Sequence, residues 1–310
     1  MLRRGRPLLD TSQTFTCFGG ACTVIVAGDG PAGDAPTAVA SARERMLAWH
    51  ETFTRFRAGE LRELNQDPRD RVPVTSIMAR FAQAAHDAAL ATGGLVDATL
   101  LEEIEQAGYR QDRLRGSLAL PMQLAMAPPR APAGPHPDER WRAIQVDART
   151  STVARPPGVK LDGGGLVKGL AADVLDEVLG AHASYVVDCD SDIRAGGTAG
   201  HERIIPIASP FDGAVLHELT LSDGAVATSG ISKRSWLERG IPSHQLLDPA
   251  TGRPAYTGVV EVTAQAPSAL QAEALAKGAL LSGPDAAPGW LVYGGVVVLE
   301  DGSHTVVESP

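Results

Sequence analysis

A run of three glycines directly before a predicted helix is the part of this chain best suited to chemistry. They are Gly163, Gly164 and Gly165. Asp162 precedes them, and Lys168 falls in the first turn of a helix that the apolar spacing of residues 170–179 predicts. Glycines allow a backbone to approach a ligand closely, and the first N–H groups of a helix attract anions. The segment therefore predicts a phosphate-binding turn.

Two common phosphate motifs fail on this segment. The dinucleotide fingerprint needs a glycine at its sixth position, and counting from Gly163 that position is Lys168. The P-loop needs Gly-Lys followed by Ser or Thr, whereas Gly169 is followed by Leu170 and Ala171. From the residues alone, an anion site and a purely structural turn both stay open.

A small polar turn is predicted at the end of a later strand. It consists of Thr228, Ser229 and Gly230. The N–H and hydroxyl groups of such a turn can bind an anion. An ordinary hairpin turn is the alternative interpretation.

A predicted hairpin follows, with His244 four residues before Asp248 and a turn at Thr251 and Gly252. Ser229, His244 and Asp248 could be drawn as a hydrolase triad, but no GxSxG elbow is present. Turn residues alone would also explain this stretch.

The charged pair Glu273 and Lys277 lies on a helix predicted over residues 269–281. Ser268 and Gln271 form a capping box at its start. An i,i+4 pair of this kind is usually a solvated surface ion pair. The alanines around it leave little bulk, which would allow close approach to a ligand.

The remaining pattern indicates an α+β fold, because strands and helices are interspersed without a steady βαβ alternation. Helices are predicted over residues 36–56 and 75–91. Strands are predicted over residues 15–27, 143–146, 152–154, 159–161, 185–188, 204–208, 216–221, 225–227, 259–265, 295–299 and 305–308. We expect an N-terminal tail over residues 1–14, one domain over 15–310, and an exposed, partly mobile Pro- and Arg-rich excursion over 110–140.

Composition excludes several classes of function. The chain has 28 basic and 37 acidic residues, and its net charge of −9 argues against binding nucleic acid or an anionic membrane surface. Three cysteines outside any CxxC pair suggest neither a disulfide framework nor a zinc site. No run approaches a membrane span, and the basic residues at the start have no apolar segment behind them, so we expect no membrane insertion and a cytoplasmic location.

Four segments in collinear order resemble the ApbE family, the FAD:protein FMN transferases. They are DGGGLVKGLAAD, VATSG, SHQLLDPATGRP and SALQAEALAKGALLSG. The family's pattern reads DLGGIAKGYAVD, VATSG, HHIIDPRTGYP and ADALATALFVLG. Weaker matches at FGGACTVIV, TRFRAGELRELN and GLVDATLL extend the resemblance over residues 18–283. Several motifs in one order are far more specific than any one of them.

The resemblance implies an ApbE-like, T-fold-related domain of two lobes with the ligand between them. It implies transfer of FMN from FAD to a Ser or Thr hydroxyl of an acceptor protein, with release of AMP. It assigns Lys168, His244 and Asp248 to catalysis, with His244 as the general base because it is matched to the histidine before IIDPRTG. Asp248 and Thr251 are expected to hold the loop that carries His244. Asp97 matches a further acidic position of the family. The residues expected to bind FAD are Asp162, Gly163, Gly164, Gly165, Lys168, Thr228, Ser229, Gly230, His244, Thr251 and Gly252.

The metal ligands of the family are only partly present. Its pattern supplies an Asp and, four residues later, a Thr to Mg²⁺, with the carbonyl of the residue before the lysine, here Val167. This chain has Glu273 and Lys277 at the two side-chain positions. Glutamate can ligate Mg²⁺, whereas a protonated lysine cannot. The hypothesis that follows is that the Lys277 ammonium takes the place of the metal, so Mg²⁺ binding stays open.

A second departure lies where the family has GGD. This chain has Asp190, Ser191 and Asp192 there, which would give the pocket a bulkier and more acidic edge. The first alternative is therefore a relative that keeps a flavin or nucleotide pocket but has lost metal-dependent transfer. Hydrolysis of FAD to FMN and AMP is a second alternative, and a serine hydrolase is a third.

Overall fold

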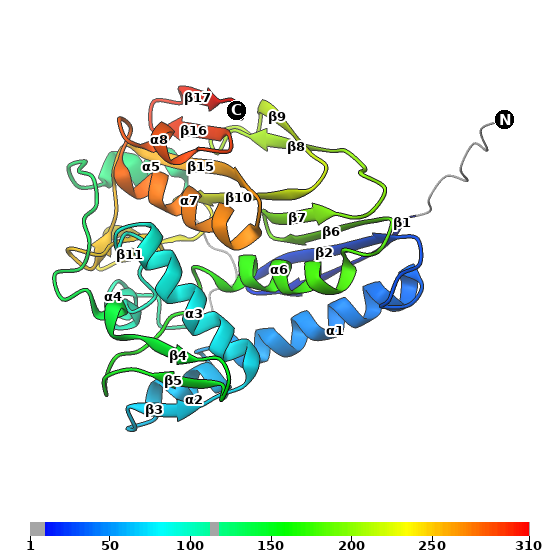
Figure 1. Ribbon diagram of the computed structural model, residues 1–310. Helices are drawn as coiled ribbons and strands as arrows, with labels where there is room; N and C mark the ends of the chain where they lie inside the picture. Colours follow the sequence, from blue (N-terminus) through cyan, green and yellow to red (C-terminus); the bar gives the residue numbers. More distant parts are fainter. Residues whose placement is uncertain (1–9, 112–117, 310) are drawn as a thin grey trace.

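An eight-stranded antiparallel sheet forms the framework of the molecule (Figure 1). The computed structural model describes residues 10–111 and 118–309. In order across the sheet, the strands are β1 (Asp10–Cys17), β2 (Gly20–Ala27), β6 (Ser184–Cys189), β7 (Asp192–Gly196), β10 (Gly224–Gly230), β15 (Val259–Ala266), β16 (Gly295–Leu299) and β17 (His304–Val307).

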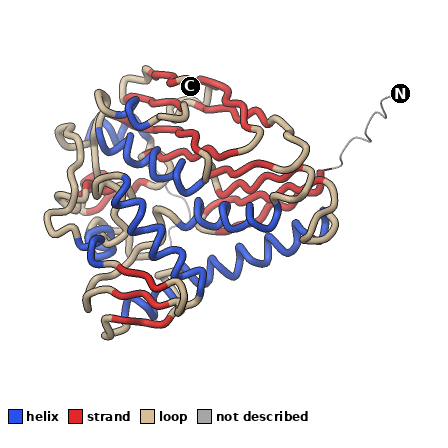
Figure 2. Tube along the Cα trace, viewed as in Figure 1, coloured by secondary structure: helices blue, strands red, loops and turns tan. Residues whose placement is uncertain are grey.

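Three helices cover one face of this sheet (Figures 1 and 2). They are α1 (Ala35–Phe53), α6 (Val167–Leu179) and α7 (Ala269–Ser282). Each turns an apolar stripe toward the strands, and the buried residues Met46, Leu175 and Ala272 share one core cluster with Val24 and Val187 of the sheet. Gly169, near the start of α6, lies against Leu270 of α7, and Gly165 lies close to Lys277, so the glycine turn meets the Glu273–Lys277 pair.

A hairpin covers part of the opposite face. It is formed by β8 (Arg203–Ala208) and β9 (Val215–Leu221), and its Ile207 and Leu219 pack with Val226 of β10. Along β10 and β15, directly opposed residues point to the same face, as in any antiparallel ladder. Thr228 and Thr263 therefore lie on the hairpin side of the sheet.

A smaller lobe packs beside the sheet and its helices. It contains α2 (Glu60–Gln66), α3 (Ser76–Ala91), the 3₁₀ helix η1 (Arg140–Ala143) and the three-stranded sheet β3 (Arg71–Pro73), β5 (Thr152–Ala154) and β4 (Gln145–Asp147). Phe81, Trp141 and Leu161 are buried in its core together with Leu166 and Leu170 around the start of α6. The glycine turn is therefore held between two cores.

The remaining elements are short. They are α4 (Leu101–Gln106), α5 (Leu120–Met126), α8 (Ala287–Trp290), the hairpin of β11 (Ser235–Glu238) and β12 (Ile241–His244), and the pair β13 (Leu247–Asp248) and β14 (Arg253–Pro254).

The α+β prediction is confirmed, and both the helix over 75–91 and the capping of α7 are as expected. The Ser268 side chain accepts a hydrogen bond from the Gln271 N–H at 3.2 Å. The single strand predicted over residues 15–27 is instead the hairpin of β1 and β2, because Gly19 has a φ of 76° and reverses the chain. The predicted tail over residues 1–14 is also corrected: β1 starts at Asp10, and residues 1–9 lie outside the described part.

The strand predicted over residues 159–161 does not form. The Asn65 side chain takes the place of a neighbouring strand, since its Oδ1 accepts a hydrogen bond from Leu161 N at 2.7 Å and its Nδ2 donates one to Leu161 O at 2.8 Å. Both backbone groups of Leu161 are satisfied this way without a ladder. The turn that follows is thereby anchored at its first residue.

The excursion predicted over residues 110–140 is also partly wrong. Residues 112–117 lie outside the described part, but the rest includes α5, whose Gln123 is fully buried. Gln123 Nε2 donates to Ile231 O at 3.3 Å and to Tyr256 Oη at 3.2 Å. These buried hydrogen bonds hold a segment whose composition alone suggested mobility.

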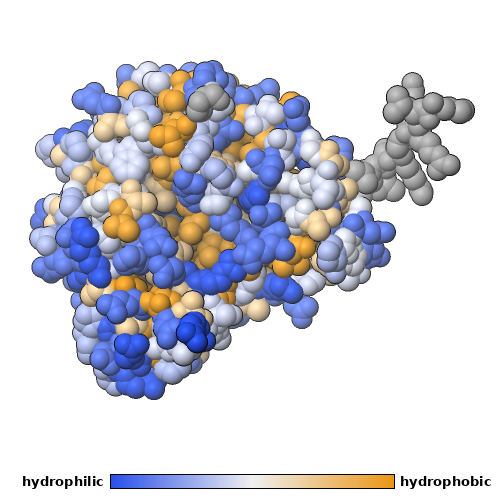
Figure 3. All heavy atoms as spheres, in the orientation of Figure 1, coloured by the Kyte–Doolittle hydropathy of each residue, from blue (hydrophilic) through white to orange (hydrophobic). Residues whose placement is uncertain are grey.

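The surface is mostly polar on the side seen in Figure 3, with apolar residues in separate patches between polar ones. Within the described ranges, every helix is too short or too polar to cross a bilayer.

Candidate active site

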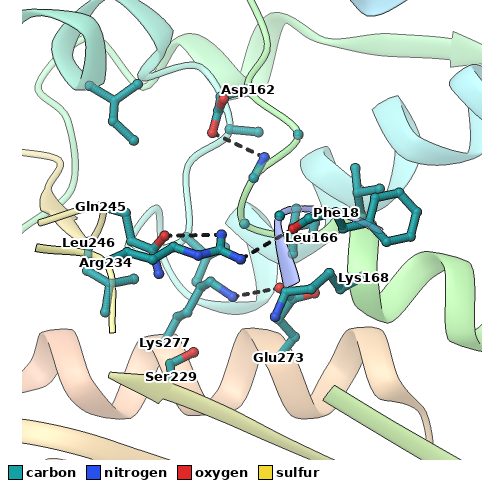
Figure 4. A pocket seen from close by; sticks show the side chains of 18 of the residues that line it. Phe18, Asp162, Leu166, Lys168, Ser229, Arg234, Gln245, Leu246, Glu273 and Lys277 are labelled. Carbon is teal, nitrogen blue, oxygen red and sulfur yellow. Dashed lines mark hydrogen bonds and ion pairs between the residues drawn. The ribbon is translucent and has the colours of Figure 1, made fainter. Parts of the chain in front are cut away.

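A cavity of about 230 Å³ lies between the small lobe and the sheet layer (Figure 4). Its wall combines segments that are far apart in the sequence. Its polar lining residues include Arg55, Asp97, Asp162, Lys168, Asp190, Asp192, Ser229, Arg234, Gln245, Glu261, Glu273 and Lys277. The glycine turn, the Thr228–Gly230 corner and the start of α6 all line it, so the structure brings together the segments that were predicted to bind one ligand.

Asp162 holds the glycine turn rather than facing a ligand freely. Its Oδ1 lies 3.0 Å from Nε of Arg55, and its Oδ2 accepts a hydrogen bond from Gly164 N at 3.2 Å. Its own N–H donates to Ala98 O at 2.8 Å. Asp162 therefore fixes the shape of the turn and neutralises Arg55, which is a positioning role.

Two of the glycines are required by close contacts. A Cβ on Gly163 would lie 2.9 Å from Cγ2 of Val167, and a Cβ on Gly169 would lie 2.8 Å from backbone atoms of Leu270. The second contact is where α6 crosses α7. Gly169 thus serves helix packing, whereas Gly163 lets the turn fold tightly onto the start of α6.

Lys168 extends from the first turn of α6 into a buried ionic site. Its Nζ lies 2.9 Å from Oδ2 of Asp192 and donates to Asp190 O at 3.2 Å. Burial alone would lower the pKa of Lys168, but the negative charges of Asp192 and Glu273 reverse this and leave it raised. Lys168 is therefore a fixed positive charge at the N-terminal end of a helix, where an anion is already favoured.

Glu273 and Lys277 form a buried ion pair on α7 instead of the surface pair that their spacing suggests. Lys277 Nζ lies 2.9 Å from Glu273 Oε1, and Glu273 Oε2 accepts a hydrogen bond from Gly169 N at 3.1 Å. The Lys277 side chain is 13% exposed and the Glu273 side chain is 2% exposed. Burial raises the pKa of Glu273, and the charge of Lys277 opposes that shift.

These residues do not fit a Mg²⁺ ion. Both carboxylate oxygens of Glu273 already accept hydrogen bonds, and an ammonium stands at the second ligand position. Among residues 10–111 and 118–309, no group of three or more His, Cys, Asp and Glu side chains is arranged to hold a metal ion. The positive charge at this place comes from Lys277 itself.

The Thr228–Gly230 corner lies at the end of β10. Thr228 Oγ1 and Thr263 Oγ1 are hydrogen-bonded at 2.8 Å on the hairpin side of the sheet, whereas Ser229 lies on the helix side and is seen near Lys277 in Figure 4. Gly230 is paired with Glu261. The corner thus presents a hydroxyl on each face at the edge of the cavity.

His244 is not placed to act as a general base, which corrects the prediction. Its side chain is fully buried, is absent from the cavity wall, and packs edge-on against Tyr256 with ring centroids 4.8 Å apart. Nδ1 accepts a hydrogen bond from Leu246 N at 3.2 Å. Burial lowers the pKa of His244 to about 3, so this imidazole is neutral and structural.

The position next to it reaches the cavity instead. In the family's pattern, the histidine lies three residues before the aspartate of IIDPRTG. The residue three positions before Asp248 is Gln245, so a glutamine stands at the place of that histidine here. Gln245 Oε1 accepts from Arg234 Nη1 at 3.4 Å, as Figure 4 shows. With the segments aligned on Asp248, Gln245 and not His244 corresponds to the family's histidine.

Asp248, Thr251 and Gly252 also stay outside the cavity wall, so no direct contact with a ligand in this cavity is seen for them. The expectation that Asp248 and Thr251 hold the loop is met. Asp248 Oδ1 accepts from Gly134 N at 2.9 Å, and its Oδ2 accepts from Thr251 Oγ1 at 2.7 Å. Gly252 has a φ of 66° and its N–H donates to Asp248 O at 2.8 Å. These residues close the turn that carries Gln245 to Leu247.

The hydrolase triad is contradicted by the same geometry. His244 Nε2 is buried with no hydrogen-bond partner in the described part of the chain, and Asp248 is bonded to its own loop and to Gly134. A serine nucleophile needs its histidine within hydrogen-bond reach and the histidine held by the acid. Ser229, His244 and Asp248 meet neither condition.

Sequence reasoning missed several charged residues of the wall. Arg234 lies 3.6 Å from Asp190 through its Nη2, and Nη2 also donates to Phe18 O at 3.3 Å. Lys233 and Arg234 form a basic pair three residues after the polar corner, a signal that was available. Arg55 lies in the segment TRFRAGELRELN, which resembles the family but for which no role was predicted. Glu261 lies in the strand predicted over residues 259–265, where the alternating pattern gave no reason to single it out.

The Asp190–Ser191 edge adopts backbone conformations that favour glycine. The φ angles are 56° for Asp190 and 81° for Ser191. Residues with a Cβ pay roughly 1–2 kcal/mol for this region. The chain therefore keeps the backbone turn of the GGD pattern without its glycines, and the Asp190 carboxyl lies on the cavity edge beside Arg234.

The profile of the ApbE family matches residues 18–298, and the chain belongs to this family. The FAD:protein FMN transferase of Rhodobacter capsulatus is 26% identical over 289 residues, which are 90% of this chain and 53% of the relative. The FAD:protein FMN transferase of Treponema pallidum is 32% identical over 154 residues, 45% of this chain and 42% of the relative. The matched stretches span about half the length of these relatives.

Solved structures show the same fold. The ApbE protein of Thermotoga maritima superposes with a TM-score of 0.77 at 25% identity and covers 97% of both chains. The flavin transferase ApbE of Vibrio cholerae gives a TM-score of 0.72 at 18% identity and covers 98% of both chains. The ApbE-like fold is therefore confirmed.

Proposed function

We propose that this protein transfers FMN from FAD to a serine or threonine hydroxyl of an acceptor protein and releases AMP. The observation that carries the proposal is the convergence of the glycine turn, the Thr228–Gly230 corner and the Lys168 and Lys277 ammonium groups on one cavity. The similarity to FAD:protein FMN transferases of other organisms supports it.

The cavity offers what phosphoryl-type transfer needs, which is positioning and neutralisation of charge. The diphosphate of FAD would lie at the N-terminus of α6, where helix N–H groups and Lys168 favour an anion. Aromatic and apolar residues of the wall, Phe18, Phe56 and Tyr109 among them, give the rings of the dinucleotide surfaces to pack against.

The proposal assigns to Lys277 the neutralising role that a metal has in the family's pattern. The ammonium is held by Glu273 at 2.9 Å on the wall of the cavity. A phosphate oxygen could displace part of that ion pair at modest cost, because the charge of Glu273 would still be balanced by Lys168 nearby. No step of the reaction is assigned to Mg²⁺.

The test is to incubate the purified protein with FAD and measure AMP, with Mg²⁺ or with EDTA. We expect AMP release to change by less than about threefold on chelation, because the neutralising charge belongs to the chain. The double variant Glu273→Asp, Lys277→Thr should become dependent on Mg²⁺. A wild-type protein that needs Mg²⁺ for turnover would contradict the role of Lys277.

The alternative is a relative that binds a flavin dinucleotide but does not transfer it. Two observations favour considering it: Gln245 stands where the pattern has histidine, and Lys277 stands at a metal position. This alternative would be established if the protein bound FAD, as seen by quenching of the flavin fluorescence, but released no AMP in the presence of peptides with a central Ser or Thr. AMP release that is independent of the peptides would identify an FAD diphosphatase.

A further inference from the structure

Glu261 of β15 is a buried carboxyl group for which the fold provides no hydrogen bond. The residue is 6% exposed, and among the described residues no donor is bonded to its side chain. Its carboxyl oxygens are not fully buried but are accessible from the cavities that Glu261 lines. Such a group is explained if a ligand completes its hydrogen bonding.

Its position lies where two cavities meet. A second cavity opens between the sheet and β8, lined by Ile193 and by residues 205–210. The residues shared by both cavities are Ser191, Thr228, Lys233 and Glu261. Glu261 therefore faces the proposed flavin cavity and a separate opening on the hairpin side of the sheet.

Gly230 makes room for the carboxyl. It is the direct cross-strand partner of Glu261, and a Cβ on it would lie 3.0 Å from Glu261 Oε2. The side chain of Glu261 consequently lies beside the Thr228–Gly230 corner, at the edge of the cavity in which the proposed function places the diphosphate. A carboxylate beside a diphosphate is unfavourable for binding alone, so its presence there calls for a chemical role.

Lys233, in the segment after β10, is the charged group that acts on Glu261. In the second cavity, β7 and β8 contribute apolar residues, and the hydroxyl groups come from Ser191, Ser209, Thr228, Ser232 and Thr263. Helix α7 packs against β10 and β15 on the other face of the sheet. The other charged residues that line the first cavity with Glu261 and Lys233 are Arg55, Asp97, Asp162, Lys168, Asp190, Asp192, Arg234, Glu273 and Lys277. Burial raises the pKa of Glu261 to about 7, and Lys233 opposes the shift.

We propose that Glu261 is the catalytic base that accepts the proton of the acceptor hydroxyl, and that this hydroxyl enters through the second cavity. The inference rests on the proposed transfer reaction. It gives that reaction a base in place of His244, whose buried ring does not reach the cavity. The short chain of hydroxyl groups from Ser191, Thr228 and Thr263 lines the path and suits a polar side chain.

The step balances without any further reactant. The acceptor oxygen forms a bond to the FMN-side phosphorus while its proton passes to a Glu261 carboxylate oxygen. The bond from that phosphorus to the bridging oxygen breaks, and AMP leaves with the electron pair. Glu261 then loses the proton to water, which its raised pKa permits near neutral pH.

The experiment compares wild type with Glu261→Gln, using FAD and a pool of synthetic peptides with a central Ser or Thr. Peptide-bound FMN is measured by mass spectrometry from about pH 5.5 to about pH 9, and FAD affinity is measured separately. We expect Glu261→Gln to lower kcat about 100-fold or more while FAD binds equally well or more tightly. The wild-type rate should fall about tenfold per pH unit below pH 7, and the variant should lose this dependence.

Glu261→Asp serves as the folding control, because it keeps a carboxyl of shorter reach and should retain the pH dependence at a lower rate. Glu218→Gln on the exposed face of β9 is the matched charge control and should behave as wild type. An active wild type whose Glu261→Gln variant keeps its rate and pH dependence overturns the role of Glu261 alone. A wild type that binds FAD but transfers nothing overturns the proposed function, and this inference with it.

Discussion

Two loops contribute to the cavity wall, residues 162–168 and residues 244–252, and their polar groups are used differently. In the first loop, Lys168 extends away from its own backbone and finds its counter-charge on Asp192 of another element. In the second, His244 and Asp248 bond to backbone groups of their own loop or lie against a core residue. Only Gln245 and two leucines of that loop reach the cavity.

The difference gives a criterion for separating functional from structural polar residues in one site. A polar side chain that satisfies its own turn has no bonding capacity left for a ligand. A charge that is held by a distant partner stays available, because a ligand can compete for it. By this criterion Lys168 belongs to the chemistry, and His244, Asp248 and Thr251 belong to the scaffold.

The largest expected effect is that of Lys168→Met. Loss of the charge at the α6 N-terminus should lower AMP release from FAD about 100-fold or more. It also leaves Asp192 buried without a partner, which should destabilise the fold by about 3 kcal/mol. Adding Asp192→Asn should restore stability but not turnover, as measured by denaturation and by AMP release.

Lys160→Met is the matched control for that experiment, since Lys160 forms an exposed ion pair with Glu102 at 2.8 Å. It should change stability by less than about 1 kcal/mol and leave turnover unaltered. If Lys168→Met keeps its turnover while substitutions at His244 or Asp248 abolish it, the two loops have the opposite roles.

An intermediate effect is expected from His244 on the pH dependence of stability. Its folded pKa of about 3 lies below the ordinary value, so the unfolded chain takes up the proton first as the pH falls. Its contribution is complete above about pH 6.5 and should diminish by about 2 kcal/mol on going to about pH 5. In His244→Gln this part of the decline should disappear, whereas the pH dependence of turnover should remain. Denaturant unfolding at several pH values measures the pH dependence of stability. If His244→Gln changed the pH dependence of turnover, His244 would have a catalytic role after all.

The smallest effect is expected at the edge of the cavity, from Ser191→Gly. The φ of 81° at this position should be relieved by glycine, which would stabilise the fold by about 1 kcal/mol. Ala199→Gly, in a loop away from the cavity, is the control and should stabilise nothing. Thermal unfolding measures both, and a Ser191→Gly variant no more stable than wild type would show that the turn carries no strain.

Part of the site could be predicted from the sequence. Glycine spacing, the capping signals of α7 and the order of the motifs are local properties, so they indicated the anion-binding turn, the main helices and the family. The strand at residues 159–161 was wrong because a distant side chain, Asn65, satisfied the backbone of Leu161. The buried α5 was missed because proline-rich flanks hid its contacts with Ile231 and Tyr256.

The sequence by itself determined which groups are available: a lysine at a helix N-terminus, a lysine at the second metal position, and a polar corner. Only the tertiary structure decided which of them face a ligand. Side-chain direction and burial depend on the packing of α6 against α7 and on the pairing of β10 with β15, contacts between residues far apart in the chain. For this reason Glu261, unremarkable in its strand, lies beside Gly230 at the junction of two cavities, while His244 is buried behind the wall.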